Sequence, residues 1–228
     1  MTRPGTGTAD DARRAFAGAD GIIFDNDGVL VDSEPVSLAA YRDAIREQGV
    51  DLCEQDDEKY CGLTDADIVR DMEKVYGLEL DLARFQARKR ELYFLYAGQR
   101  GLPAFPGARD LLGSLVAARR PIALASSAPT EKITHNLAAA GLGGLFRVVV
   151  TGEDFARGKP DPEIFLRAAE RLGTEPGRCV VIEDSINGLR AARAAGMFGI
   201  GITNTFPAER LAPHADAVIT SLDQLMPR

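Results

Sequence analysis

The chain has 228 residues, a 45% share of hydrophobic residues and a formal net charge of -7, enough for one large core or for a core with a smaller insert. The acidic balance argues against nucleic-acid binding, because that function needs a basic surface that displaces counterions from phosphates. The three cysteines, Cys53, Cys61 and Cys179, lack C-x-x-C spacing, which argues against a disulfide framework or a zinc site and favours a reducing compartment, the cytoplasm.

The N-terminal segment MTRPGTGTADDARR is polar and lacks the apolar run of a signal peptide. No stretch of the chain approaches the ~20 apolar residues of a membrane span. We therefore expect a soluble protein that does not contact membranes, with residues 1–15 as a flexible tail.

The first strand is expected at the apolar run GIIF, residues 21–24, and it leads directly into two aspartates, Asp25 and Asp27. Side chains at positions i and i+2 of an extended chain point the same way, so both carboxylates could face one pocket. Gly28 permits the backbone to turn sharply away. This stretch is the first candidate for a catalytic site.

Residues 36–97 show helical periodicity, for example at Ile68, Met72 and Val75, but contain no convincing strand. The Gly- and Pro-rich segment GQRGLPAFPG then leads into a different pattern. We therefore expect an all-helical cap over residues 33–100, inserted after the first strand.

From residue 101 onward, short apolar runs alternate with helical patterns. The runs are PIALASS, RVVVTGED, CVVIEDS, MFGIGIT and DAVITS. Such alternation is typical of βαβ units, which build a parallel sheet with helices on both faces. The predicted fold class is therefore α/β, with a Rossmann-like core formed by residues 16–32 and 101–228.

Polar residues stand where the expected strands end: Asp25 and Asp27, Ser126 and Ser127, Lys159, Glu183 and Asp184. Ligands of an open parallel sheet bind at the carboxyl ends of its strands, so these side chains converge if the strands are neighbours. Four carboxylates beside one lysine are costly unless protons or a cation intervene. Mg²⁺ is the simplest cation to propose, because it takes carboxylate oxygens, keeps waters and typically touches a substrate phosphate.

The remaining polar groups suit a phosphorylated ligand. Ser126, Ser127 and Lys159, with the first N–H groups of a helix near Pro129, could hold phosphate oxygens. Ser127 could instead only cap that helix. Asp25 is the candidate nucleophile that forms an aspartyl phosphate. Asp27 is the candidate general acid and base, provided that its carboxyl stays off the metal, which favours coordination through its backbone carbonyl.

Four stretches in order, DNDGVLVDSE, ALASS, GKPDP and IEDSINGLRAARAAGM, resemble the motifs of the haloacid dehalogenase-like superfamily. They look most like its branch with a helical cap, which includes β-phosphoglucomutase and many small-molecule phosphatases. The resemblance implies that Asp25 is nucleophile and metal ligand, and that Asp27 is acid/base and metal ligand through its carbonyl. It also implies phosphoryl binding by Ser126 and Lys159, and a Mg²⁺ site completed by Glu183 and Asp184.

The chain departs from the mutase pattern of that branch, which places a histidine and basic residues in the cap. The corresponding positions here are Ser37, Cys61 and Asp65. A mutase must retain a doubly phosphorylated intermediate, so the loss of these cations favours water as the acceptor. The predicted function is a phosphatase of a small phosphorylated metabolite, such as a sugar phosphate, with a phosphomutase as the alternative. The leaving group cannot be read from the cap turn, Cys61, Leu63, Thr64 and Asp65.

With Ile23 as position 1, the stretch from Asp25 to Glu34 partly matches a calcium loop, but it follows a strand instead of a helix and has no paired loop. Glu183 could support the site without touching metal. A silent protein of this fold could serve only as a binding module. A monomer is favoured, without a sequence signal that decides it.

Overall fold

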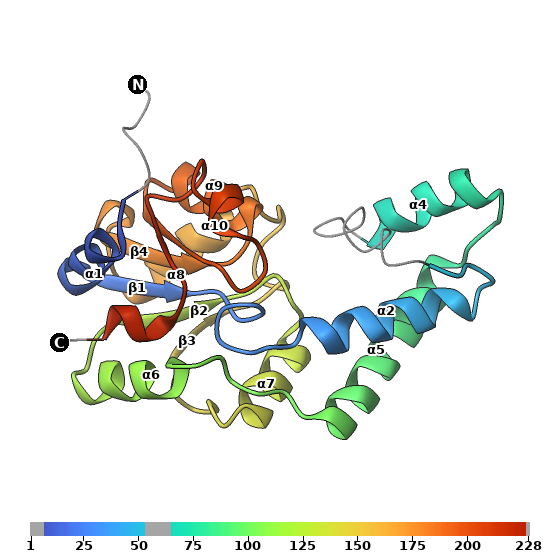
Figure 1. Ribbon diagram of the computed structural model, residues 1–228, viewed down its shortest axis with the longest axis horizontal. Coiled ribbons are helices and arrows are strands. Elements are labelled where there is room, and N and C mark those ends of the chain that lie inside the picture. The colour runs from blue at the N-terminus through green and yellow to red at the C-terminus, as the bar shows by residue number, and fades with distance from the viewer. Residues whose placement is uncertain (1–6, 53–64, 227–228) are drawn as a thin grey trace. The chain divides into compact units, whose positions relative to one another are not determined.

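The computed structural model describes residues 7–52 and 65–226, and the chain divides into two compact units. One unit comprises Met1–Asp32 with Leu102–Arg228, and the other comprises Ser33–Gly101. The first unit holds the sheet and the second is helical in its described residues (Figure 1).

The sheet of the first unit has six strands in the order β3-β2-β1-β4-β5-β6, and every pairing is parallel. The strands are β1 (Gly21–Phe24), β2 (Ile122–Ala125), β3 (Val148–Val150), β4 (Cys179–Glu183), β5 (Phe198–Ile202) and β6 (Ala217–Ile219). The central strands β1, β2 and β4 are buried along their whole length, as expected for parallel strands covered on both faces. The predicted α/β class is confirmed.

Helices cover both faces of this sheet (Figure 1). Helices α8 (Glu163–Leu172), α9 (Ile186–Ala194) and α10 (Ala208–Leu211) cover one face, and α1 (Ala9–Gly18), α6 (Ala108–Ala117) and α7 (Thr130–Ala139) cover the other. From β1 to β3 the sheet grows in one direction, and from β4 to β6 it grows in the other direction, on the far side of β1. Because the crossovers are right-handed, the helices that follow β3 lie on the opposite face from α6 and α7. Short 3₁₀ turns lie at η1 (Pro176–Arg178) and η2 (Leu222–Leu225).

The expectation of a flexible tail over residues 1–15 is wrong from Ala9 onward. Thr8 and Asp11 form a capping box at the start of α1, with reciprocal hydrogen bonds between each side chain and the other residue's backbone. Ala12 and Phe16 are buried. The prediction was wrong because the polar composition of this segment gave no sign of a short amphipathic helix whose apolar face packs on the core. Residues 1–6 lie outside the described residues.

The helical unit contains α2 (Glu34–Arg46), α4 (Asp65–Tyr76) and α5 (Leu82–Arg100), with α2 and α5 packed along each other. Tyr41 and Phe85 meet edge to face across that contact, with ring centroids 5.7 Å apart. The carboxylate of Asp81 caps α5 by accepting from the Arg84 amide at 3.0 Å. The unit therefore has a small core of its own.

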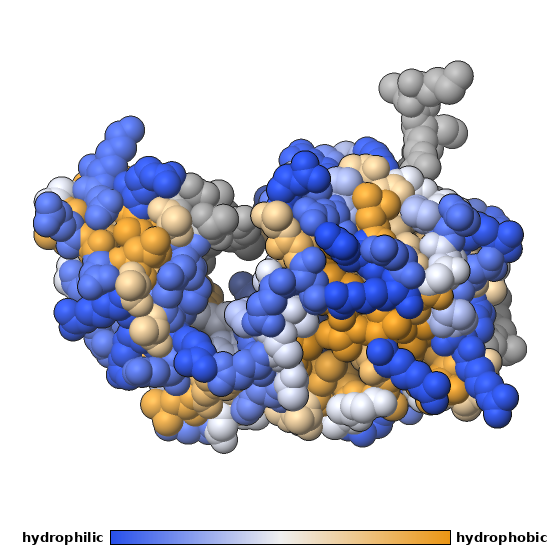
Figure 2. Space-filling model, turned by 180° about the vertical axis from the view of Figure 1, so that it is seen from behind, coloured by the Kyte–Doolittle hydropathy of each residue, from blue (hydrophilic) through white to orange (hydrophobic). Residues whose placement is uncertain are grey.

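The surface carries hydrophilic residues over much of the side drawn in Figure 2, interrupted by hydrophobic areas on both units. Among the described residues, no helix combines the length and the apolar character that a membrane crossing requires.

Candidate active site

Parallel pairing brings three sequence positions to one edge of the sheet. Asp25, Ser126 and Asp184 are the first residues after β1, β2 and β4, and β1 lies between the other two strands. The pairs Phe24↔Leu124 and Phe24↔Ile182 set the register. The carboxyl ends of these strands therefore stand side by side, as a ligand site at the strand ends requires.

The centre of this edge is a buried acidic cluster. Asp25, Glu183 and Asp184 each offer a carboxylate oxygen within 4.8 Å of the others. Their exposed fractions are 7%, 1% and 7%. Lys159, in the loop before α8, places Nζ 2.6 Å from Asp25 Oδ1 and 2.6 Å from Glu183 Oε1. The structure thus brings together four residues from three separate segments of the sequence.

Asp25 and Glu183 share the ammonium of Lys159, and burial together with crowding of the carboxylates raises the pKa values of Asp25 and Asp184. Burial, followed by repulsion from Glu183, raises the pKa of Asp25 to about 7, although Lys159 opposes the shift. Burial and its two carboxylate neighbours also raise the pKa of Asp184. Burial disfavours the charge of Lys159, but Asp25 and Glu183 outweigh it and raise the pKa of the ammonium. Without a cation these shifts favour protonation of Asp25 and Asp184, and a divalent cation would stabilise their charged forms.

Glu183 is held by protein groups on both carboxylate oxygens. Its Oε2 accepts hydrogen bonds from the Ser185 amide at 2.7 Å and the Ser185 hydroxyl at 2.8 Å, while Oε1 accepts from Lys159. Gly188 makes room for it, since a Cβ there would lie 1.8 Å from Oε1. Glu183 therefore orients Lys159 whether or not it also touches a metal.

Two partners of Asp27 lie on α7 and not among the residues of the cluster. Its Oδ1 accepts a hydrogen bond from Asn136 Nδ2 at 3.0 Å and lies 3.3 Å from Lys132 Nζ, both on α7. Asn136 is fully buried. The i, i+2 alternation does not bring both carboxylates to the same partners, because the chain turns at Asn26, whose carbonyl accepts from the amides of Leu30 and Val31.

The two candidate phosphate-binding serines differ in exposure. Ser126 is buried, and its hydroxyl accepts from the Ala128 amide at 3.2 Å, which closes the turn before α7. Ser127 is exposed. Pro129 is the N-cap residue of α7, so Ser127 is not its cap. Helix α7 begins shortly after β2, so its start lies near the carboxyl end of that strand, and the Thr130 amide donates to Glu153 Oε1 at 3.3 Å.

Sequence reasoning missed four residues that support the site: Lys132, Asn136, Asn204 and Thr205. Lys132 and Asn136 are four positions apart on α7, a spacing that places them on one helix face and could have been noticed. Thr205 donates from its hydroxyl to Asp184 Oδ2, and Asn204 donates to the Gly28 carbonyl at 2.8 Å. Their only sequence signal is their position just after an apolar strand.

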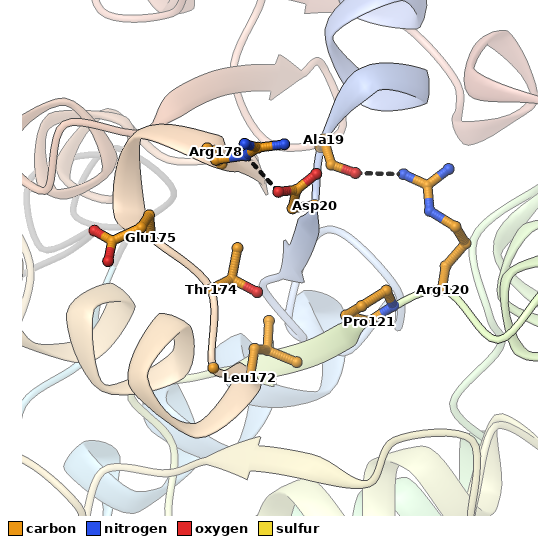
Figure 3. A pocket seen from close by; sticks show the side chains of 9 residues that line it. Ala19, Asp20, Arg120, Pro121, Leu172, Thr174, Glu175 and Arg178 are labelled. Carbon is orange, nitrogen blue, oxygen red and sulfur yellow. Dashed lines mark hydrogen bonds and ion pairs between the residues drawn. The ribbon is translucent and has the colours of Figure 1, made fainter.

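A cavity lies at the opposite edge of the sheet, lined by residues that precede β1, β2 and β4 (Figure 3). Its arginines are engaged in the fold: Arg178 pairs with Asp20, and Arg120 donates to the Ala19 carbonyl at 2.7 Å. It contributes nothing to the carboxylate cluster.

The fold and the site define an α/β enzyme with a helical insert and an acidic centre at the ends of its parallel strands. Residues 19–196 match the model of the haloacid dehalogenase-like hydrolases. The chain belongs to this family, which confirms the prediction made from its four motifs.

Known proteins agree with this assignment. The chain is 38% identical over 189 residues to SUPPRESSOR OF QUENCHING 1, chloroplastic, of Arabidopsis thaliana, covering 81% of this chain but only 18% of that longer protein. It is 34% identical over 176 residues to a phosphorylated carbohydrates phosphatase of Thermotoga maritima, covering 77% and 81% of the two chains. A solved haloacid dehalogenase-like protein of Agrobacterium tumefaciens is 32% identical, with a TM-score of 0.76 over 91% of this chain and 96% of that one.

Proposed function

We propose that this enzyme is a Mg²⁺-dependent phosphatase that hydrolyses a sugar phosphate through an aspartyl phosphate on Asp25. The observation that carries the proposal is the buried contact of Asp25 with Lys159 beside Glu183 and Asp184. The named activity of the Thermotoga maritima relative supports phosphatase chemistry and a phosphorylated carbohydrate as the substrate class.

The first half-reaction joins Asp25 to the phosphoryl group. A carboxylate oxygen of Asp25 attacks phosphorus, the bond from phosphorus to the leaving oxygen breaks, and Asp27 donates a proton to that oxygen. In the second half, Asp27 removes a proton from water, the water oxygen attacks phosphorus, and the bond to Asp25 breaks. The hydrogen bond from Asn136 supports this role because it gives the Asp27 carboxyl a partner on α7, outside the acidic cluster.

The residues present fit a Mg²⁺ ion, because the buried carboxylates of Asp25, Glu183 and Asp184 exceed the single ammonium of Lys159. Asp27 would contribute its backbone carbonyl. The cation would neutralise negative charge on the phosphoryl oxygens. Lys159, the two serines Ser126 and Ser127, and the first amides of α7 would hold the remaining phosphoryl oxygens.

The helical unit Ser33–Gly101 is proposed as a cap that excludes water until the leaving group departs and then admits one molecule. Among the positions that distinguish a mutase, Asp65 replaces a cation and pairs with Lys89 at 2.5 Å, while Cys61 lies outside the described residues. This acidic position favours the phosphatase over the phosphomutase. The cytoplasm is the proposed location.

The test is inorganic phosphate release from a panel of sugar phosphates and nucleotides, with Mg²⁺ and with chelator. Metal-dependent release that is strongest for sugar phosphates is the expected result. Isomer interconversion that needs a bisphosphate primer would instead identify a mutase. Binding of panel compounds without phosphate release or isomerisation would identify a binding module.

A further inference from the structure

The loop after β5, residues 203–207, reaches the site from a strand that does not adjoin β1. Strand β4 lies between β5 and β1 in the sheet. Nevertheless, Asn204 Nδ2 donates to the Gly28 carbonyl at 2.8 Å, and Thr205 donates to Asp184 Oδ2. Two successive side chains of one loop thus bind the loop after β1 and the residue after β4.

Gly28 shows how closely these segments meet. A Cβ at Gly28 would lie 1.9 Å from Asp184 Oδ2 and 3.0 Å from Thr205 Oγ1. The backbone there has φ of 78°, a conformation that favours glycine. Asp184 is only 7% exposed, so its carboxylate is enclosed by Gly28 on one side and held by Thr205.

We infer that Thr205 and Asn204 are positioning residues of the proposed metal site. Thr205 fixes one oxygen of Asp184 and leaves the second for the cation, while Asn204 holds the loop that carries Asp25 and Asp27 against the same point. A neutral hydroxyl suits this role because it orients the carboxylate without neutralising its negative charge, as a cationic side chain would. The inference rests on the proposed metal-dependent function.

The effect on metal binding follows from pre-organisation. A carboxylate already held in one orientation loses little rotational freedom when a cation binds, whereas a freed carboxylate must be ordered at that step. Loss of a hydrogen-bond partner behind a metal ligand typically weakens metal affinity about 10- to 100-fold. We expect the Mg²⁺ affinity to depend on the hydroxyl group of Thr205 and not on the size of its side chain.

The experiment is a calorimetric titration of the full-length protein with Mg²⁺ in the absence of substrate. Thr205→Val should bind Mg²⁺ about 10- to 100-fold more weakly than wild type, and Thr205→Ser should recover most of the affinity. Asn204→Ala should also weaken binding. Thr203→Val is the matched control in the same loop, since Thr203 bonds through its backbone amide to the Ile219 carbonyl, and it should leave the affinity unchanged.

Circular dichroism and the melting temperature in chelator verify that each variant is folded, so a purely structural role would lower stability without changing Mg²⁺ affinity. Wild-type affinity in folded Thr205→Val would overturn the inference. Failure of the wild type to bind Mg²⁺ would overturn it together with the metal-dependent function. Normal Mg²⁺ binding by wild type without phosphate release would overturn the phosphatase alone, and the affinity of Thr205→Val would still decide the positioning role.

Discussion

Asn136 donates a 3.0 Å hydrogen bond to Asp27 from helix α7, 109 positions further along the chain. Asp25 instead contacts Lys159 within the acidic cluster. Two aspartates of one short motif therefore have different partners, as distinct roles of nucleophile and acid/base require.

The different partners of the two aspartates predict that Asp27→Asn removes proton transfer but not metal binding. Turnover should fall about 10²- to 10⁴-fold, the usual contribution of general acid–base catalysis. The affinity for Mg²⁺, measured by calorimetry, should stay close to that of wild type because the backbone carbonyl remains. Loss of Mg²⁺ affinity equal to that caused by Asp184→Asn would show that the Asp27 carboxylate is itself a ligand.

Asp25→Asn should abolish phosphate release while leaving the fold intact, because an amide cannot form the aspartyl phosphate. Release of inorganic phosphate and circular dichroism provide the two measurements. Asp110→Asn is the control, since Asp110 is an exposed residue of α6. More than about a tenth of wild-type turnover in Asp25→Asn would refute the nucleophile assignment.

Lys159→Met should both inactivate the enzyme and destabilise it. The change leaves Asp25 and Glu183 buried without their shared ammonium, and removal of one partner of a buried ion pair costs about 3–5 kcal/mol. Urea unfolding in chelator measures the loss, and added Mg²⁺ should restore part of it because the cation replaces the missing positive charge. An unfolding free energy equal to that of wild type in chelator would be incompatible with this description of the cluster.

Two glycines in helices provide a matched comparison. An alanine Cβ at Gly188 would lie 1.8 Å from Glu183 Oε1, whereas nothing lies within 4 Å of the corresponding point at Gly113. Gly188→Ala should displace the carboxylate, destabilise the protein by about 1–3 kcal/mol and lower activity. Gly113→Ala should stabilise it by about 0.5–1 kcal/mol without changing activity. Equal effects of the two substitutions on activity would argue against Glu183 as a positioned group.

Asp154 provides a pH test outside the site. The hydrogen bond from Arg171, aided by that from the Thr151 amide, lowers the pKa of Asp154 from 3.8 to about 2. Its stabilisation is therefore complete above the ordinary value and is lost as the pH falls toward 2. Asp154→Asn should lower the unfolding free energy by about 1 kcal/mol at pH 7 and by clearly less at pH 3, as judged by urea unfolding. A difference that is the same at both pH values would contradict this linkage.

The strands, their parallel arrangement and the family follow from the sequence because their signals are local. Apolar runs such as GIIF and CVVIE predict buried strands, and the polar residues that follow them mark the functional edge. Asp25, Lys159, Glu183 and Asp184 could be nominated for this reason. The polar composition of the N-terminal segment, in contrast, led to a wrong prediction at α1. A capping box and two buried side chains stabilise a helix there.

The partners of each polar side chain were decided by tertiary structure. Asp27 meets Asn136, 109 positions away, and Gly28 meets Asn204, 176 positions away. Neither contact has a periodic signal, because it depends on which strands are neighbours and how each loop leaves its strand. The sequence determined which residues stand at the carboxyl ends of the strands, while the packing of distant segments determined which carboxylates meet in the acidic cluster and which one contacts a helix.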